Sequence, residues 1–246
     1  PTDASLTFQG VRGMARCKPA TFDLDIPSGT KLQAQASSHG VQRLFTSLLK
    51  RFEEPEGGLL TLGGDDICAK DVHGLRREVI VLDRPTMVEM TLREYLSLAN
   101  NQAPSAEMLR VLRSVGLIDV IEELQDGLDT KISATGWPLS ISEAMRLKLA
   151  AAILSQPSVL VLSQLYDTLP SEALRNAIAG VSTDGGTPST VIVFTTRGDD
   201  LGLGTFLWMT PEKQEMFSAY RAFRAATQEH ATPDVAAHLK PVVSEA

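Results

Sequence analysis

The sequence predicts an α/β fold built on a mostly parallel sheet that is covered on both faces. Short apolar runs alternate with segments of helical periodicity along the 246 residues. Two of the runs, Val159–Leu162 and Val191–Phe194, are apolar at every position, as expected of central strands. A mostly helical stretch at about residues 90–145 interrupts the strands, and it predicts a helical subdomain inserted into the core.

Strands are expected where apolar and β-branched residues cluster between turn residues. Alternating apolar side chains, as at Phe22, Leu24 and Ile26, indicate strands with one buried face in the first sixty residues. In chain order, the expected strands are Thr7–Gln9, Thr21–Asp25, Leu59–Leu62, Val79–Leu82, Ser158–Leu162, Thr190–Thr195 and Thr205–Trp208.

Helices are expected where apolar residues recur three and four positions apart. Two of them begin with a capping box, Thr91 with Glu94 and Ser140 with Glu143, in which the side chain of each residue bonds the other's backbone N–H. In chain order, the expected helices are Val41–Arg51, Leu92–Leu98, Ala106–Gly116, Ile141–Ser155, Ser171–Gly180 and Pro211–Thr227.

The C-terminal part is expected to be a helix followed by a loosely held tail. Aromatic residues that would pack this helix on the domain recur at helical spacing, at Phe217, Tyr220 and Phe223. The segment Glu229–Ala246 contains two prolines and several alanines, which are typical of a chain end with few contacts. We therefore expect one domain over residues 1–212 and the helix with its tail over 213–246.

Composition and charge disfavour several classes of protein. The formal net charge is −7, whereas proteins that bind a nucleic-acid backbone are usually basic. Two cysteines, Cys17 and Cys68, give neither a disulfide framework nor a metal-binding pair of cysteines. No apolar run reaches the length of a membrane span, so we expect no membrane insertion of this segment. The chain begins with Pro1 rather than Met, as expected of a piece cut from a longer polypeptide.

Several short stretches occur in the order known from one family. They are Pro27–Lys31, Glu54–Ile67, Leu75–Arg77, Asp126–Thr130 and Pro157 with the strand after it. With them, the chain from about Ser5 to Thr210 resembles the nucleotide-binding domain of ABC transporters, most closely the exporter type. The resemblance implies a P-loop NTPase-like ABC ATPase fold, with a mixed sheet core, an N-terminal antiparallel β subdomain and an inserted helical subdomain.

The resemblance places the phosphate-binding loop at Gln35–Leu44. Such a loop needs glycines, a lysine for the β- and γ-phosphates and a hydroxyl for Mg²⁺. Here Gly40 remains, while Val41 stands at the lysine position and Gln42 at the hydroxyl position. Loss of the lysine alone weakens binding about ten- to a hundredfold. We therefore expect weak ATP binding or none, and no Mg²⁺. The other loop residues are Ser37, Ser38, His39 and Arg43. The loop is either a capped polar turn or a remnant anion site.

The other catalytic positions of the family also carry different residues. The acids that should end the Walker B strand fall on Ser163 and Gln164, and the nearest carboxylate is Asp167. An amide can orient a water molecule but cannot take its proton. The remaining positions fall on Asp83 or Arg84 for the glutamine loop, on Pro170 for the following acidic loop and on Thr196 for the switch histidine.

The signature motif of the family, a serine followed by glycines and a glutamine, falls on Leu139, Ser140, Ile141, Ser142 and Glu143. In the family this helix start faces the γ-phosphate across a dimer. A carboxylate already in the first turn repels a phosphate there. The simplest interpretation of this segment is the capping box alone. We also expect Trp137, which precedes it, to be a buried anchor.

These residues favour a degenerate, non-hydrolysing nucleotide-binding domain with no catalytic residue and no metal. The resemblance implies a structural or regulatory half of an exporter. Its partners would be a transmembrane domain and a second nucleotide-binding domain, the same or an intact one, at the cytoplasmic face of the membrane. Two alternatives stay open. One is an atypical ATPase with a rebuilt site that uses Gln164 or His39. The other is a metal-free module in which Ser37–Gln42 senses a non-nucleotide anion.

Overall fold

The centre of the fold is a mixed sheet. The structure is a computed structural model that describes residues 3–179, 181, 186 and 188–229. In this part of the chain the sheet has six strands in the order β12-β11-β3-β10-β9-β6. All neighbours are parallel except β12, which pairs antiparallel with β11. The strands are β3 (Lys31–Ala36), β6 (Val79–Leu82), β9 (Val159–Leu162), β10 (Thr190–Phe194), β11 (Thr205–Met209) and β12 (Gln214–Phe217).

A second sheet, antiparallel, is formed by the N-terminal part of the chain. Its strands, in the order β2-β1-β4-β5, are β1 (Leu6–Ala15), β2 (Lys18–Ile26), β4 (Gly57–Leu62) and β5 (Asp65–Asp66). Helix α1 (His39–Leu49) packs between the two sheets, because its apolar residues share one core cluster with both. This arrangement confirms the antiparallel subdomain implied by the sequence.

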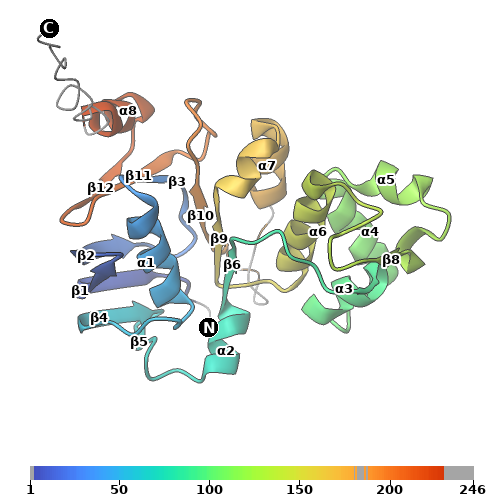
Figure 1. The fold of residues 1–246 in the computed structure, drawn as a ribbon, viewed down its shortest axis with the longest axis horizontal. Coiled ribbons are helices and arrows are strands. Elements are labelled where there is room, and N and C mark those ends of the chain that lie inside the picture. Colours follow the sequence, from blue (N-terminus) through green and yellow to red (C-terminus); the bar gives the residue numbers. More distant parts are fainter. Residues whose placement is uncertain (1–2, 180, 182–185, 187, 230–246) are drawn as a thin grey trace, which may run out of the picture.

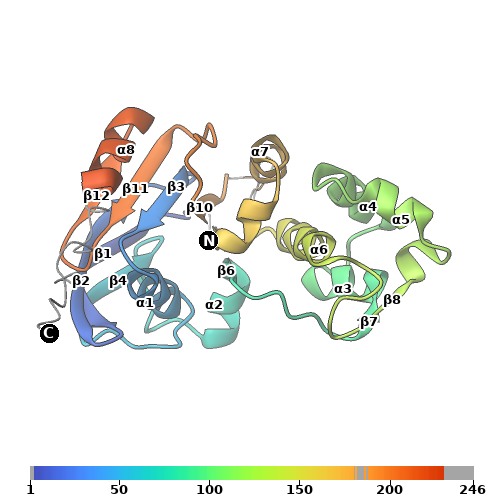
Figure 2. The same ribbon diagram turned by 45° about the horizontal axis from the view of Figure 1, so that its top comes forward.

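A helical subdomain lies at the other end of the molecule (Figure 1 and Figure 2). It contains α3 (Leu92–Ala99), α4 (Ser105–Ser114), α5 (Ile118–Glu123), α6 (Ile141–Leu154) and the short pair β7 (Met90–Thr91) and β8 (Lys131–Ile132). The other elements are α2 (Val72–Glu78), α7 (Ser171–Ala179), α8 (Tyr220–Glu229) and two 3₁₀ turns, Gly127–Asp129 and Gln164–Thr168. Both expected capping boxes form, at the starts of α3 and α6.

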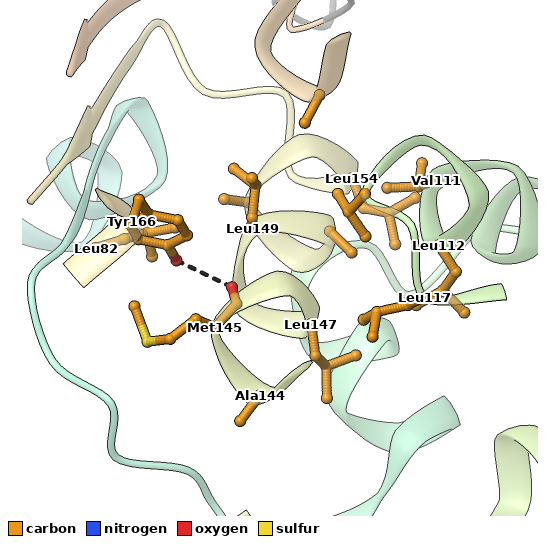
Figure 3. Close-up of a cluster of buried hydrophobic side chains, with 14 of the residues drawn as sticks. Leu82, Val111, Leu112, Leu117, Ala144, Met145, Leu147, Leu149, Leu154 and Tyr166 are labelled. Carbon is orange, nitrogen blue, oxygen red and sulfur yellow. Dashed lines mark hydrogen bonds between the residues drawn. The ribbon is translucent and has the colours of Figure 1, made fainter. Parts of the chain in front are cut away.

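Tyr166 joins the helical subdomain to the central sheet (Figure 3). Its ring is fully buried in the largest apolar cluster, and its hydroxyl donates a hydrogen bond to the carbonyl of Met145 in α6, at 3.1 Å. Burial raises the pKa of the Tyr166 hydroxyl, so it remains a protonated donor. The turn after β9 is thereby attached to the helix that carries the predicted signature segment.

The expected strands all form, but the expected helix over Pro211–Thr227 is wrong in its first half. Residues Gln214–Phe217 form β12 instead, because Thr210 and Lys213 hydrogen-bond across a turn that folds the chain back on β11. Helix α8 begins only at Tyr220. The aromatic residues of this segment do pack on the domain as predicted, with Phe223 stacked on Phe206 at 5.4 Å.

One central strand, β3, was not expected, because its sequence of lysine, glutamines and alanines is poor in β-branched residues. Its buried Gln33 is satisfied by the loop after β10: it donates to the carbonyl of Asp199 and accepts from the N–H of Leu201. The expected end of helix α7 at Gly180 and the expected tail at 230–246 lie outside the described residues. Among the described residues, no helix has the length and apolar character of a membrane span.

Candidate functional site

The predicted phosphate loop lies where β3 ends and α1 begins, at the carboxyl edge of the parallel strands. Ser38 is the N-cap of α1: its hydroxyl accepts a hydrogen bond from the N–H of Val41, at 3.3 Å. The N–H of Ser37 is bonded to the carbonyl of Met209 in β11, at 2.8 Å. The helix therefore begins at His39, two residues before the expected start. The backbone bond of Ser37 to β11 holds the loop against the sheet edge, and the Ser38 cap fixes the start of α1.

Gly40 lies against β1, and Val41 is buried in the core between the two sheets. A Cβ atom at Gly40 would lie 3.3 Å from the carbonyl oxygen of Ala15, so glycine allows α1 to approach β1 closely. The side chain of Val41 is 0% exposed and belongs to the core between the two sheets. His39 and Arg43 on the same helix are exposed. At its first turn, α1 thus presents an apolar residue to the core where the family pattern has a lysine.

Gln42 and Gln164 form a reciprocal amide pair between α1 and the end of β9. Nε2 of Gln42 donates to Oε1 of Gln164 at 2.9 Å, and Nε2 of Gln164 donates back to Oε1 of Gln42. The Gln42 residue is 5% exposed. Ser163 uses its hydroxyl locally, accepting from the N–H of Leu165 at 3.4 Å. The pair is uncharged and mutually satisfied, so it contributes no carboxylate and no proton acceptor to the site.

Breaking this amide pair should cost stability. We expect Gln42→Ala to lower the free energy of unfolding by about 1–3 kcal/mol, because it leaves the Gln164 amide without its partner. The double variant Gln42→Ala/Gln164→Ala should lose less than the sum of the two single losses, with a coupling of about 0.5–3 kcal/mol. Urea denaturation of the native chain, of Gln42→Ala, of Gln164→Ala and of the double variant measures this double-mutant cycle. Strictly additive losses would show that the pair contributes nothing.

A cavity of about 690 Å³ adjoins the amide pair, between α1 and the segment that follows β6. Lys50 at the end of α1 forms an ion pair with Asp83, the residue predicted for the glutamine loop, at 2.5 Å. The same Lys50 ammonium lies over the ring of Phe52, 4.7 Å from its centroid. Arg43 and Arg84 also line the cavity. Asp83 is therefore held by α1 and does not stand free.

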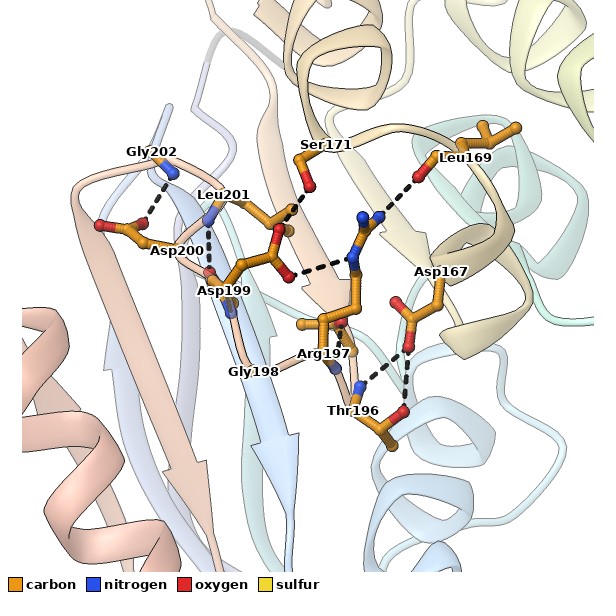
Figure 4. Close-up of polar contacts among 12 residues, drawn as sticks. Asp167, Leu169, Ser171, Thr196, Arg197, Gly198, Asp199, Asp200, Leu201 and Gly202 are labelled. Carbon is orange, nitrogen blue, oxygen red and sulfur yellow. Dashed lines mark hydrogen bonds and ion pairs between the residues drawn. The ribbon is translucent and has the colours of Figure 1, made fainter.

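Thr196, predicted for the switch position, lies in a separate polar network at the end of β10 (Figure 4). Oδ2 of Asp167 accepts hydrogen bonds from the N–H of Thr196 at 2.9 Å and from its hydroxyl at 3.1 Å.

The neighbouring Arg197 donates to Oδ1 of Asp199 at 3.1 Å and to the carbonyl of Leu169. The hydroxyl of Ser171 donates to Asp199, and this bond, with the nearby Arg197, lowers the pKa of the Asp199 carboxyl. The network ties the end of β10 to the segment after β9.

The predicted signature segment Leu139–Glu143 is not part of the cavity. Ser140 caps α6 through the N–H of Glu143 at 3.3 Å, and the Glu143 carboxylate accepts from the N–H of Ser140 at 2.7 Å. Ile141 is 73% exposed. The expectation that Trp137 is a buried anchor is wrong, because its side chain is 72% exposed. Trp137 stands in a turn that is closed by a hydrogen bond from the N–H of Ser133 to the carbonyl of Trp137, at 2.9 Å.

The structure thus brings six of the predicted site residues to one cavity: His39, Gln42, Arg43, Asp83, Ser163 and Gln164. Ser142 and the rest of the signature segment lie on the helical subdomain, and Thr196 is held by Asp167. Among the described residues, no group of three His, Cys, Asp or Glu side chains is arranged to hold a metal ion. The two partnerships at the sheet edge, Gln42 with Gln164 and Asp167 with Thr196, were not predicted from the sequence.

The fold is that of an ABC-type ATPase domain. The structure of a bacterial Atm1-family ABC exporter with ATP bound matches 92% of this chain and 41% of that chain, with a TM-score of 0.77 and 21% identity. No family model matches the sequence. Among curated proteins, the mitochondrial potassium channel ATP-binding subunit of Mus musculus is 31% identical over 178 residues, which are 70% of this chain and 25% of that protein.

A second relative points to the same family. The ABC multidrug transporter mdr2 of Aspergillus fumigatus is 30% identical over 174 residues, 68% of this chain and 22% of that protein. The chain belongs to the family of ABC exporter nucleotide-binding domains. It spans about a quarter of the length of the curated relatives that it matches.

Proposed function

We propose that this chain is a nucleotide-binding domain that does not hydrolyse ATP and that serves as a structural or regulatory half of an ABC exporter. The Gln42–Gln164 pair carries the proposal. By the family resemblance, these residues stand where a Mg²⁺-binding hydroxyl and the acid that activates water are needed. Mg²⁺ in nucleotide sites is usually held through one or two carboxylates and the substrate phosphates, and general-base catalysis needs a group that accepts a proton. Two amides bonded to each other provide neither.

Three further contacts support the same proposal. Val41, at the lysine position, points its side chain into the core. Asp83 is held by Lys50, and Thr196 is held by Asp167, so neither side chain is free to sense a phosphate. Phosphoryl transfer depends on positioned charges around the transferred group. In this domain the amides of Gln42 and Gln164, the carboxylate of Asp83 and the hydroxyl of Thr196 are each engaged by a neighbouring side chain.

The proposed partners are a transmembrane domain and a second nucleotide-binding domain, either a copy of this chain or an intact one. A groove of about 950 Å³ between β6, α3 and α6 offers a place for a cytoplasmic segment of the membrane domain. Its rim carries Leu98, which is 70% exposed, and Val88, which is 54% exposed. Exposed apolar side chains around a groove are typical of interaction sites. This coupling would place the chain at the cytoplasmic face of the membrane.

The proposal is tested by phosphate release from Mg-ATP. We expect the purified chain to release no phosphate above the rate of a protein-free control. The variant Gln164→Glu should also be inactive, because Val41 and Ser163 remain at the other two positions. Mg²⁺-dependent turnover that is lost in Gln164→Ala or in His39→Ala would contradict the proposal. It would establish a rebuilt ATPase site instead.

A further inference from the structure

We propose that the cavity between α1 and the segment after β6 binds a small organic anion without a divalent cation. The ligand class is a flat apolar body that carries a carboxylate or a phosphate monoester. This binding activity goes beyond the non-hydrolysing role proposed above. The volume of about 690 Å³ lies within the range of about 300–1,000 Å³ that is usual for small-molecule sites.

Two arginines supply the charge for the anion. Arg43 reaches the cavity from α1 and Arg84 from the segment after β6, and both side chains are exposed. Within the described residues, neither guanidinium has an ion-pair partner or a hydrogen bond, whereas Lys50 and Asp83 neutralise each other. Glu53 is the remaining charged lining residue. Guanidinium groups bind carboxylates and phosphates through paired hydrogen bonds, so two free ones in one cavity favour an anion.

An aromatic ring and apolar side chains supply the surface for the body of the ligand. Phe52 is 58% exposed although it lines a cavity, and Lys50 covers its ring at 4.7 Å. Val81 and Pro85 line the same space. A flat ring gains from stacking on Phe52 as well as from leaving water. The combination of free arginines and an exposed ring predicts that an aromatic anion binds better than a bare inorganic one.

The residues that line the cavity offer little to a divalent cation. The amide pair of Gln42 and Gln164 lines the cavity without charge, and Asp83 is engaged by Lys50. This leaves Glu53 alone to bind a divalent cation, which usually needs several oxygen ligands. Ser37 and Ser38 do not line the cavity. The site therefore includes the C-terminal part of the predicted loop, through His39, Gln42 and Arg43, but not the two serines before it.

Calorimetric titration of the full chain in EDTA tests this site. The probes are 1-naphthyl phosphate, 1-naphthoate and inorganic phosphate. We expect the better of the two aromatic anions to bind more tightly than inorganic phosphate, and the ranking of the two identifies the anionic group. Arg43→Gln/Arg84→Gln should weaken its binding at least about tenfold, since each charged hydrogen bond contributes that much. Phe52→Ala should weaken the binding of the aromatic probes and leave the affinity for inorganic phosphate unchanged.

A matched control separates a local effect from a change in net charge. Arg110→Gln/Arg113→Gln removes two positive charges from exposed positions on α4 and should leave the affinity unchanged. The proposal is overturned if neither aromatic probe binds at millimolar concentration, if the double arginine variant binds as tightly as the native chain, or if binding requires Mg²⁺. None of these results bears on phosphate release from Mg-ATP. Failure of the anion site and failure of the non-hydrolysing role are therefore distinguishable.

Discussion

Replacing Phe45 by alanine is expected to lower the free energy of unfolding by about 3–5 kcal/mol. Phe45 is 0% exposed on the inner face of α1. Its ring is stacked on Phe8 at 5.0 Å and meets Phe22 at 5.9 Å and Phe194 at 5.8 Å, edge to face. These partners come from both sheets, so a single truncation leaves a cavity at the point where the two sheets and the helix meet.

Urea denaturation followed by circular dichroism measures this loss, and the same chain offers a control. Phe52 follows α1 but is 58% exposed, so Phe52→Ala removes the same number of atoms from a solvent-exposed position. We expect that variant to lose less than about 1 kcal/mol. Equal losses for Phe45→Ala and Phe52→Ala would show that α1 is not anchored by the aromatic cluster.

Restoring the family's lysine at position 41 should destabilise the domain and should not create an ATPase. Val41 is 0% exposed and packs between the sheets, so Val41→Lys brings a cation towards the core. A lysine side chain can bend towards water, which limits the loss to about 2–4 kcal/mol. Phosphate release should stay at background, because Ser163 and Gln164 supply no carboxylate. Denaturation curves and phosphate assays on the same preparation measure both effects.

The control for this substitution is His39→Lys, which adds a lysine at an exposed position on the same helix. His39→Lys should lower the free energy of unfolding by less than about 1 kcal/mol, mostly because it places a positive charge at the N-terminus of α1. Two results would contradict the account. One is Mg²⁺-dependent phosphate release by Val41→Lys. The other is a stability loss no larger than that of His39→Lys.

Much of the fold could be predicted because it depends on local patterns. The strands at Val159–Leu162 and Val191–Phe194 are apolar at every position, and burial on both faces of a covered sheet produces that pattern. The capping boxes at Thr91 and Ser140 are also local, since each joins residues three positions apart. Strand β3 was missed because its stability comes from its place between β10 and β11, not from its residue types.

The errors near the chain end and around the site have a common cause, which is tertiary context. Helical spacing of aromatic residues suggested a helix from Pro211, but pairing with β11 forms a strand at Gln214–Phe217. The exposed position of Trp137 depends on the turn that carries it.

Alignment with the family located Gln42 and Gln164 individually. Their hydrogen bonds join residues 122 positions apart, so no local pattern could predict the pair. The same applies to Asp167 and Thr196, which are 29 positions apart. What the sequence provides here is the identity of each residue, and the structure adds which residues are engaged with one another.

Calorimetric titration of ATP into the full chain, with Mg²⁺ and separately with EDTA, tests the central claim most directly. We propose that this domain has no metal-dependent nucleotide site, because Gln42 and Gln164 are bonded to each other at the positions where the family resemblance places the metal-binding hydroxyl and the acid that activates water. The proposal predicts that Mg²⁺ does not strengthen ATP binding, whether ATP binds weakly or not at all. Micromolar binding that appears with Mg²⁺ and disappears in EDTA would contradict it.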